Sequence, residues 1–381
     1  MQYSEIEAIG ANASNALEMF HEVRTDVKEM FQPLSYSQAE MYSLLRSTNR
    51  PIARNTLIEE MANMEAEGYK FSRVGGNDSG PYSLSHSDCI AIADRIGVNK
   101  YRVLSNGKAY VCFIQNLKGG VGKSLGTNML ATALVNLPKY LLKDIRVLII
   151  DLDPQATSTQ QNYPSNKLDD GVYTSIALMC EETDKEDIAL NGIKHTAHSN
   201  IDIIPCSTSD GFYADKINTD EVKGDNAYQE LLLKRIINKF EDDYDFILLD
   251  AGPHMDSVLK NCLWAANGVY IPVPTTFYNF DSTLRFLQRL PVVFKELVDD
   301  GLDLSRLDFI KPYISKAPTS ENSQDKEVYA NAQSDLNGIF SFNNTIKHDL
   351  PEEDVYERCA ETGGTVFTIR QKDYALSLIH I

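Results

Sequence analysis

The stretch that decides the fold is Lys118-Gly-Gly-Val-Gly-Lys-Ser124, which follows the apolar run Tyr110–Ile114. The apolar run predicts a buried strand, and residues 123 to about 136 predict a helix. Glycines between strand and helix let backbone N–H groups turn inward around phosphate oxygens. The helix directs the positive end of its dipole at the same anion. This order predicts a nucleotide-phosphate site rather than an ordinary glycine-rich turn.

Two lysines frame this loop. Lys123 would reach the β- and γ-phosphates, while the Ser124 hydroxyl would hold Mg²⁺. Lys118 opens the loop, at a place where an ordinary phosphate-binding loop requires no lysine. Two lysines around one nucleotide suggest that one of them serves a neighbouring subunit. The other loop residues expected to bind nucleotide are Gly119, Gly120, Val121, Gly122 and Leu125.

Two later apolar runs end in carboxylates. Asp151 and Asp153 follow the first run, and they lie two residues apart, so both would face the same side of a strand. One could organise the waters of Mg²⁺ and the other could hold the attacking water, because phosphoryl transfer depends on positioning and electrostatics. A solvated turn is the alternative. Asp250 ends the second run in a Walker B arrangement and would bind Mg²⁺ through water.

Two backbone features near these strand ends could also meet the nucleotide. Gly252 could place its N–H near the γ-phosphate and act as a switch. Pro274, within Ile271–Thr276, could shape a rim for the purine base, although an ordinary loop explains that segment equally well.

Residues 110–381 alternate short apolar runs with helical patterns. Continuous β-branched runs are typical of parallel strands that are buried on both faces. Ligands in such sheets bind beyond the carboxyl ends of the strands, where the motifs above lie. The sequence therefore predicts an α/β P-loop domain with a mostly parallel sheet. Besides the first strand, the expected strands are Val147–Ile150, Ile201–Pro205, Phe246–Leu249, Val269–Val273 and Phe309–Ile314.

Residues 1–33 carry a different pattern. Apolar side chains recur at spacings of three and four over residues 3–31, from Ile6 to Met30, and Pro33 follows. Four such heptads predict a long helix that pairs with another subunit. Packing of the helix on its own domain is the alternative.

Residues 34–100 predict a winged helix-turn-helix domain, followed by a linker at 101–109. The expected elements are helices at about 37–47, 53–68 and 86–96 and short strands at 69–73 and 81–84 around a glycine-rich wing. A small helical domain without a DNA role is the alternative. The residues expected to contact DNA, at the start of the second helix and beside the wing, are Arg50, Arg54, Asn55, Thr56 and Arg73.

Composition restricts the partners, metal sites and location that the chain can have. The net charge of −18 argues mildly against nucleic acid as a partner, so DNA binding would need local patches. The six cysteines show no metal-ligand spacing and are typical of a reducing cytoplasm. No apolar run is long enough for a membrane span, and the first residues lack a secretory signal.

Taken together, Lys118–Ser124, Asp151–Gln155 and Asp250–Pro253 resemble the deviant Walker ATPases. The chain is most similar to the ParA group of DNA-partition ATPases. Its large subgroup, with an N-terminal helix and a winged helix-turn-helix, resembles nearly the whole chain. The stretch Arg54–Tyr69 looks like that subgroup's DNA-binding helix, and Tyr356–Cys359 resembles its C-terminal region.

The resemblance implies roles for individual residues. Lys118 would reach across an ATP-sandwich dimer, while Lys123 and Ser124 would bind phosphate and Mg²⁺. Asp153 would position the hydrolytic water. Asp151 would support the magnesium shell, and Asp250 would be the Walker B acid.

The resemblance also implies a cellular role. ATP-bound homodimers would bind nucleoid DNA without sequence preference and segregate a plasmid or chromosome, and a ParB-type partner would stimulate hydrolysis and release them. The winged domain would repress the protein's own operon, and assembly into filaments on DNA stays open. We expect the family's last amphipathic helix to be short or missing here. The basic residues left for the non-specific DNA surface are Lys347, Arg358, Arg370 and Lys372.

The principal alternative function is a nucleotide-regulated transcriptional repressor in which ATP hydrolysis is incidental. An electron donor like the nitrogenase iron protein would need cysteines that bridge a cluster at a dimer axis, and Cys180 and Cys262 are not in such a setting. A membrane-bound regulator would need a basic amphipathic C-terminal helix, for which Tyr374–Ile381 is too short.

Overall fold

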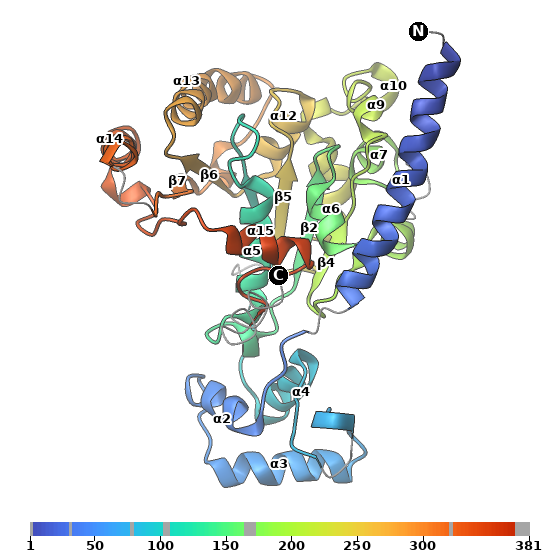
Figure 1. The fold of residues 1–381 in the computed structure, drawn as a ribbon, viewed down its shortest axis with the longest axis vertical. Coiled ribbons are helices and arrows are strands. Elements are labelled where there is room, and N and C mark those ends of the chain that lie inside the picture. The colour runs from blue at the N-terminus through green and yellow to red at the C-terminus, as the bar shows by residue number, and fades with distance from the viewer. Residues whose placement is uncertain are drawn as a thin grey trace.

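The body of the molecule is one seven-stranded sheet with helices on both faces (Figure 1). The computed structural model describes residues 3–29, 33–76, 80–101, 107–163, 173–319 and 323–369. The strand order is β3-β4-β2-β5-β1-β6-β7. The strands are β1 (Tyr110–Ile114), β2 (Val147–Leu152), β3 (Lys194–His195), β4 (Ile201–Ile204), β5 (Phe246–Ala251), β6 (Gly268–Pro274) and β7 (Phe309–Ser315).

Every neighbouring pair in this sheet is parallel except β3 and β4. The predicted mostly parallel sheet is therefore confirmed. Strand β3 was not expected from the sequence, because its two polar residues form no apolar run. In register, Asp250 pairs with Ile114 of β1 and with Asp151 of β2, so the carboxyl ends of these three strands meet at one edge.

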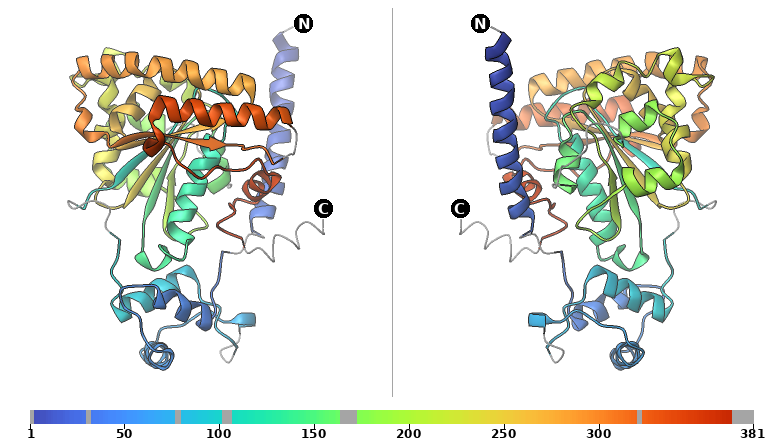
Figure 2. Two further views of the ribbon diagram at one scale, coloured as in Figure 1. Left: turned by 90° about the vertical axis from the view of Figure 1, so that its left-hand side faces the viewer. Right: turned by 90° about the vertical axis from the view of Figure 1, so that its right-hand side faces the viewer.

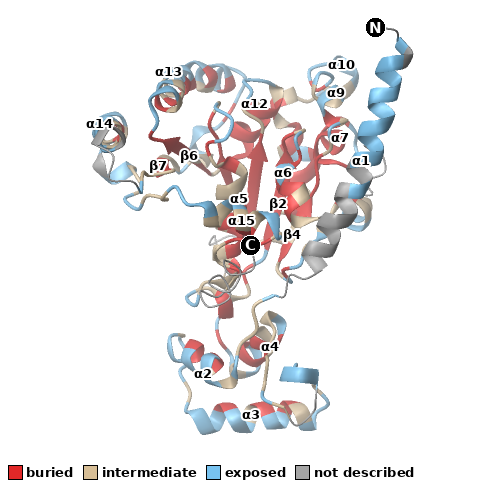
Figure 3. Ribbon diagram, viewed as in Figure 1, coloured by how far each residue is buried: buried red, intermediate tan, exposed pale blue. Residues whose placement is uncertain are grey.

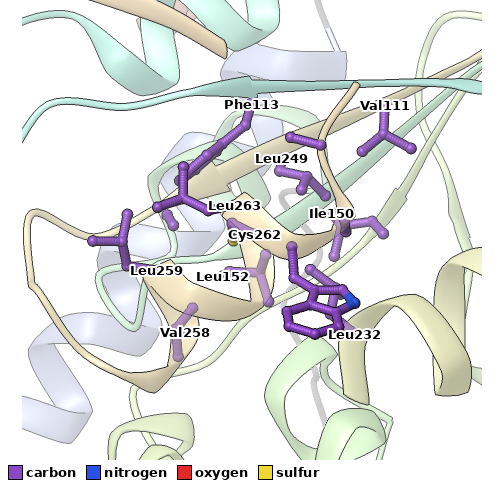
Figure 4. Close-up of a cluster of buried hydrophobic side chains, with 14 of the residues drawn as sticks. Val111, Phe113, Ile150, Leu152, Leu232, Leu249, Val258, Leu259, Cys262 and Leu263 are labelled. Atoms are coloured by element: carbon purple, nitrogen blue, oxygen red, sulfur yellow. The ribbon is translucent and has the colours of Figure 1, made fainter. Parts of the chain in front are cut away.

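Alternate residues of the strands build the two faces of the core. Val111 and Phe113 face a cluster that includes Leu232 and Leu263, from the helices of one layer (Figure 4). Cys112 faces the other layer, where Ala131 and Val135 of the long helix after the phosphate loop pack. The central strands β1, β2 and β5 are buried at nearly every position (Figure 3), as expected for a sheet covered on both faces.

Helices and short helical turns join these strands. The α-helices from the first strand onward are α5 (Lys123–Asn136), α6 (Thr157–Asn162), α7 (Ser175–Cys180), α8 (Lys185–Asp187), α9 (Asp210–Ala214), α10 (Asp220–Lys223), α11 (Asn238–Phe240), α12 (Ser257–Ala265), α13 (Phe277–Asp299), α14 (Ser323–Phe340) and α15 (Asp354–Glu361). The short turns are η2 (Leu141–Lys143), η3 (Ile188–Gly192), η4 (Tyr228–Glu230), η5 (Leu233–Ile237), η6 (Leu304–Arg306) and η7 (Phe342–Asn344).

Below this body lies a small helical unit, with α2 (Gln38–Arg46), α3 (Arg54–Ala66) and α4 (His86–Ile96) (Figure 2). Capping boxes start α2 at Ser37 and α4 at Ser85, which explains why the predicted helix starts are close to the observed ones. The three helices share one core that includes Met41, Leu57, Met61 and Ile92.

The expected hairpin of this unit is shorter than predicted. In place of two strands there is one antiparallel bridge, between Arg73 and Tyr82, beside the turn η1 (Val74–Gly76). The bridge is extended by backbone hydrogen bonds from Val74 N to Pro81 O and from Ser83 N to Ser72 O. Glycine-rich sequence next to the bridge has no side chains that could stabilise a longer ladder. The wing residues 77–79 lie outside the described residues.

The C-terminal end of α5 joins this unit to the body. Leu141 and Leu142 of η2 are buried within the core of the helical unit rather than in the body. The joint is reinforced by a Lys100–Asp144 ion pair of 2.7 Å and by a 2.9 Å contact between His86 Nδ1 and Ser199 Oγ. The chain that leaves the P-loop helix therefore enters the core of the N-terminal unit.

The long helix α1 (Tyr3–Glu29) stands beside the body (Figures 1 and 2). Its helical conformation was predicted. Every side chain described in it, at residues 3, 5–16 and 19, is exposed, including the large apolar Ile6 and Ile9 (Figure 3). The stripe residues Phe20, Val23, Val27 and Met30 lie outside the described side chains. Pairing of α1 with a second copy stays a prediction.

Candidate nucleotide-binding site

The phosphate loop is fixed by two buried amides that follow β1. The Asn116 Nδ2 donates to Pro272 O and to Thr283 Oγ1, each at 2.8 Å, and its Oδ1 accepts the N–H of Lys118. The Gln115 Nε2 donates to Gly252 O at 3.2 Å. These bonds connect the loop to the ends of β5 and β6, so the loop is held in place by the sheet edge.

Two glycines allow the loop to turn into α5. Gly120 and Gly122 adopt φ values of 72° and 91°, which side chains rarely tolerate. Because Gly122 directly precedes α5, the first N–H groups of this helix face the loop. The structure thus has the strand, loop and helix that the sequence predicts for phosphate binding.

The two lysines of the loop lie in different environments. Lys123 is 7% exposed, and its Nζ donates to Lys118 O at 3.2 Å. Burial lowers the pKa of Lys123, while Asp250 and Asp153 act in the opposite direction. Lys118 is exposed, and it forms no ion pair with any residue that the structure describes. The Lys123 ammonium is therefore enclosed by this chain, whereas Lys118 is open to solvent.

Two carboxylates are buried side by side at the ends of β2 and β5. Asp151 accepts hydrogen bonds from the N–H and hydroxyl of Thr159, at 2.7 and 2.8 Å. Asp250 accepts the Ser158 hydroxyl on Oδ2 at 2.6 Å, but its Oδ1 is buried and has no hydrogen-bond partner in the described chain.

The pKa values of both carboxyl groups are raised. Burial, and secondly the charge of Asp250, raise the pKa of Asp151 well above its usual value. Burial raises the pKa of Asp250 to about 6, while the hydrogen bond from Ser158 and the nearby Ser124 hydroxyl act in the opposite direction. Two adjacent buried acids that resist ionisation are a site where a cation would be stabilising.

These residues fit Mg²⁺. The partnerless oxygen of Asp250 and the nearby Ser124 hydroxyl are hard oxygen ligands, and Asp151 lies in register beside them. In the described ranges no group of three or more His, Cys, Asp and Glu side chains could hold a metal ion. Magnesium is commonly held by one or two carboxylates, waters and substrate phosphates.

Asp153 lies beside the glycine that follows β5. A Cβ on Gly252 would lie 3.5 Å from Asp153 Cγ, an ordinary contact distance, and 3.3 Å from His254 Cδ2, which is tight. The Asp153 Oδ1 accepts the N–H of Gln155 at 2.9 Å. His254 lies at the same junction.

A cavity of about 380 Å³ opens at the phosphate loop. Seven of the predicted residues line it, namely Gly119, Gly120, Gly122, Lys123, Ser124, Leu125 and Asp153. The other predicted residues, Lys118, Val121, Asp151, Asp250, Gly252 and Pro274, lie outside its lining. Eight further lining residues were not among those expected from the sequence, namely Gln155, Thr157, Gln161, Pro253, Lys316, Tyr356, Glu357 and Ala360.

The comparisons with known proteins agree with this geometry. A family model described as an AAA domain matches residues 109–302. Over 332 residues the chain is 34% identical to plasmid partition protein A of Escherichia coli, a match that covers 85% of this chain and 79% of the relative. The chain belongs to the plasmid partition protein A family. It is a P-loop ATPase.

Other relatives and solved structures support the same assignment. The sporulation initiation inhibitor protein Soj of Bacillus subtilis is 29% identical over 201 residues, 51% of this chain and 72% of Soj. A solved structure named "Partition Protein" matches all of both chains, with a TM-score of 0.72 and 26% identity. A variant of Cyanothece McdA in complex with ATP, 16% identical, shares the fold with a TM-score of 0.55 over 70% of this chain and 92% of its own.

The residues predicted to contact DNA lie in several environments. Arg50, Arg54, Asn55 and Thr56 are exposed around the start of α3. Arg73 instead bonds within its own unit, with an ion pair to Glu65 of 2.5 Å, a hydrogen bond to Gly80 O and a position 4.0 Å from the centre of the Tyr82 ring.

The remaining candidates are in the ATPase body. Lys347 is exposed, and Arg358 is half-buried on α15. Arg370 and Lys372 lie outside the described residues. No helix in the described part of the chain is long and apolar enough to cross a membrane.

Proposed function

We propose that this ATPase drives DNA partition as a nucleotide-controlled homodimer. The observation that carries the proposal is the contrast between the two loop lysines. Lys123 is buried in its own site, whereas Lys118 is exposed at the mouth of the loop, where its ammonium can meet a nucleotide bound to a second copy. Family membership over most of the chain supports the same conclusion.

ATP with Mg²⁺ supplies the transferable phosphoryl group and the cation that balances its charge. Lys123 and the loop N–H groups bind the β- and γ-phosphates. Ser124 and Asp250 hold the cation, with Asp151 supporting its shell. Asp153 orients the attacking water. The N–H of Gly252 lies near the γ-phosphate and acts as a switch.

Basal hydrolysis is slow on this proposal. Sites of this class gain about 10³–10⁵ in rate when a cationic side chain is supplied to the transition state. Lys118 of a second copy supplies part of that charge. A ParB-type protein and DNA raise the rate further, and hydrolysis then releases the dimer from DNA.

The chain divides into four functional parts on this proposal. Helix α1, within residues 1–33, pairs the two copies through its exposed apolar side chains. Residues 34–100 act as a winged helix-turn-helix that binds the operator, with Arg50, Arg54, Asn55 and Thr56 on its exposed face. Residues 101–109 link it to the ATPase domain at 110–381. That domain binds nucleoid DNA in the cytoplasm without sequence preference. Filaments are one form in which the dimers assemble on DNA.

A nucleotide-regulated repressor is the second candidate function. The exposed start of α3 favours it, because a helix that carries Arg54 and no acidic residue in its first turn suits an anionic partner. Operator binding alone would then be the output, and hydrolysis would be incidental.

The test is binding of the full chain to a long random-sequence duplex at stated salt, because phosphate contacts are salt-sensitive. Three states are compared: without nucleotide, with ADP, and with a slowly hydrolysed ATP analogue. Tight binding with the analogue alone supports the partition ATPase. Binding to the promoter of its own operon, with no binding to random DNA in any state, supports the repressor instead.

A further inference from the structure

A set of buried polar side chains behind the nucleotide cavity holds Asp250. Its Oδ2 accepts the hydroxyl of Ser158, on α6, and that hydroxyl lies 2.9 Å from Nδ2 of Asn128, on α5. Asn128 and Ser158 are 1% and 0% exposed, and neither lines the cavity. We propose that Asn128 and Ser158 are positioning residues, which orient Asp250 so that one of its oxygens stays open to the cation of the nucleotide. The inference rests on Asp250 holding Mg²⁺, as in the proposed function.

The hydrogens of this set have one consistent arrangement. The Asn128 Nδ2 carries two hydrogens, and it donates to Ser158 Oγ and to Ser124 O, at 2.9 and 2.8 Å. The Asn128 Oδ1 accepts from Asn162 Nδ2, which fixes which end of the Asn128 amide is the oxygen. Because Ser158 Oγ accepts from Asn128, its single hydrogen is left for Asp250 Oδ2, at 2.6 Å. The Ser158 hydroxyl therefore selects one oxygen of Asp250.

The two buried acids differ in what remains open. Asp151 uses both oxygens within the chain, since Oδ2 accepts from Thr159 and Oδ1 accepts the N–H of Asp153 at 3.1 Å. Asp250 uses only Oδ2, and its buried Oδ1 has no hydrogen-bond partner in the described chain. A buried carboxylate oxygen without a donor is costly unless a ligand completes it. The hydrogen bond from Ser158 thus leaves Asp250, rather than Asp151, with an oxygen for the cation.

The Asn128 amide also connects Asp250 to the phosphate loop. Ser124 is the second residue of α5 and carries the other hydroxyl expected at the cation, and Asn128 follows it by about one helical turn. The same Nδ2 therefore bonds to the backbone of one expected ligand and, through Ser158, to the side chain of the other. Partners of this kind orient the side chains that hold a metal ion. One buried amide sets the position of Asp250 relative to Ser124.

The test measures ADP binding to the full chain by calorimetry, in EDTA and over a series of Mg²⁺ concentrations. Binding in EDTA reports the phosphate loop and the fold, whereas the magnesium series also depends on the orientation of Asp250. We expect Ser158→Ala to raise the half-saturating Mg²⁺ concentration about 10–100-fold, the usual effect of removing a partner that orients a metal ligand. ADP binding in EDTA should change less than about twofold, because Ser158 does not contact the loop.

Asn128→Ala and the double variant test the order of the two residues. Asn128→Ala should raise the half-saturating Mg²⁺ concentration by about threefold to tenfold, since Ser158 still reaches Asp250 but its hydrogen is no longer directed. The double variant should lie within about twofold of Ser158→Ala, because Asn128 acts on Asp250 through Ser158.

Thr132→Val is the matched control on α5. It removes a buried hydroxyl one helical turn after Asn128, where that hydroxyl bonds to Asn128 O and lies 2.7 Å from Thr365 Oγ1. The magnesium series should not change in this variant. Thermal unfolding shows whether each variant is folded. Should Ser158→Ala not fold, Ser158→Cys keeps the volume and a weak donor, and it should give a smaller shift in the same direction.

Several outcomes would overturn the positioning role and leave the cation site intact. Equal weakening of ADP in EDTA and in Mg²⁺ by Ser158→Ala would mean that its hydroxyl only supports the fold. An unchanged magnesium series would mean that Asp250 needs no orientation from α6, and additive effects in the double variant would mean that Asn128 does not act through Ser158. ADP binding by the unmodified chain that is independent of Mg²⁺ would instead refute the cation site of the proposed function, and the positioning role with it.

Discussion

Acidic side chains have different surroundings in the ATPase body and in the N-terminal unit. At the sheet edge, Asp151 and Asp250 are buried side by side, and one oxygen of Asp250 has no partner in the described chain. In the N-terminal unit, Glu65 pairs with Arg73, and Glu67 pairs with Arg95 at 2.7 Å. The buried carboxylates of the sheet edge form no ion pair with the described residues, whereas these two glutamates of the N-terminal unit pair with arginines of the same unit.

The largest expected effect comes from removing the buried ammonium group of Lys123 at this sheet edge. Lys123→Ala should weaken ATP about 10³-fold and abolish ATP-dependent DNA binding, because a buried charge contact is lost. Calorimetry with an ATP analogue, together with DNA binding, measures both. Lys118→Ala is the control: it should keep ATP binding in one protomer but lose the ATP-dependent dimer. Retention of ATP binding by Lys123→Ala would contradict the buried-lysine assignment.

Removal of Asp153 should separate binding from turnover. Asp153→Ala should lower partner-stimulated hydrolysis about 10²–10⁴-fold, the usual contribution of a group that positions or deprotonates water. ATP and DNA binding should stay within a few-fold of the unmodified chain, since Asp153 is assigned to the water and not to the phosphates. If Asp153→Ala also loses ATP affinity, its role is in ground-state binding and the assignment is wrong.

Asp250→Asn should stabilise the protein without ligands. The folded pKa of Asp250, about 6, lies above its ordinary value of 3.8, so the folded chain holds a proton that the unfolded chain has lost between those pH values. The free energy of unfolding therefore falls as pH rises through about 4 to 6, by up to about 3 kcal/mol from this group.

The Asp250 comparison is made by urea unfolding at pH 7.5 and pH 4. The Asn variant should be more stable than the unmodified chain at pH 7.5, and the difference should vanish near pH 4. Adding Mg²⁺ with ATP analogue should reverse the order at pH 7.5, because only the carboxylate gains from the cation. A variant that is less stable at pH 7.5 without ligands would show that Lys123 already compensates Asp250.

The strand, loop and helix at the phosphate loop could be predicted from the sequence, and the reason is local. The loop, Asp153 and the carboxylates of β2 and β5 are defined by short spacings after buried strands, and register brings those strand ends together. The cavity-lining residues of α15 lie more than 200 positions after the phosphate loop, so no local sequence pattern connects that helix with the loop. Its one sequence signal was the resemblance of Tyr356–Cys359 to the family's C-terminal region.

The N-terminal unit shows a different limit of sequence reasoning. Helix starts were predictable because capping boxes are local. The ion-pair partner of Arg73 was not predictable, because the fold brings Glu65 to it. A basic residue beside a glycine-rich loop has the same sequence pattern whether or not it forms an ion pair. The structure distinguishes Arg73 from Arg54, which is exposed and forms no ion pair with the described residues.

That distinction gives the smallest expected effect. Arg54→Ala should weaken binding to the promoter several-fold and reduce the slope of log affinity against log salt by about 0.9, as for one lost phosphate contact. Arg73→Ala should leave the slope unchanged, because its guanidinium is engaged by Glu65 and Tyr82. Affinity is measured over a salt series for both variants, with thermal unfolding to confirm that each is folded. Equal changes in slope would mean that Arg73 leaves Glu65 for DNA, and that charge pairing in the apo unit does not identify its contact surface.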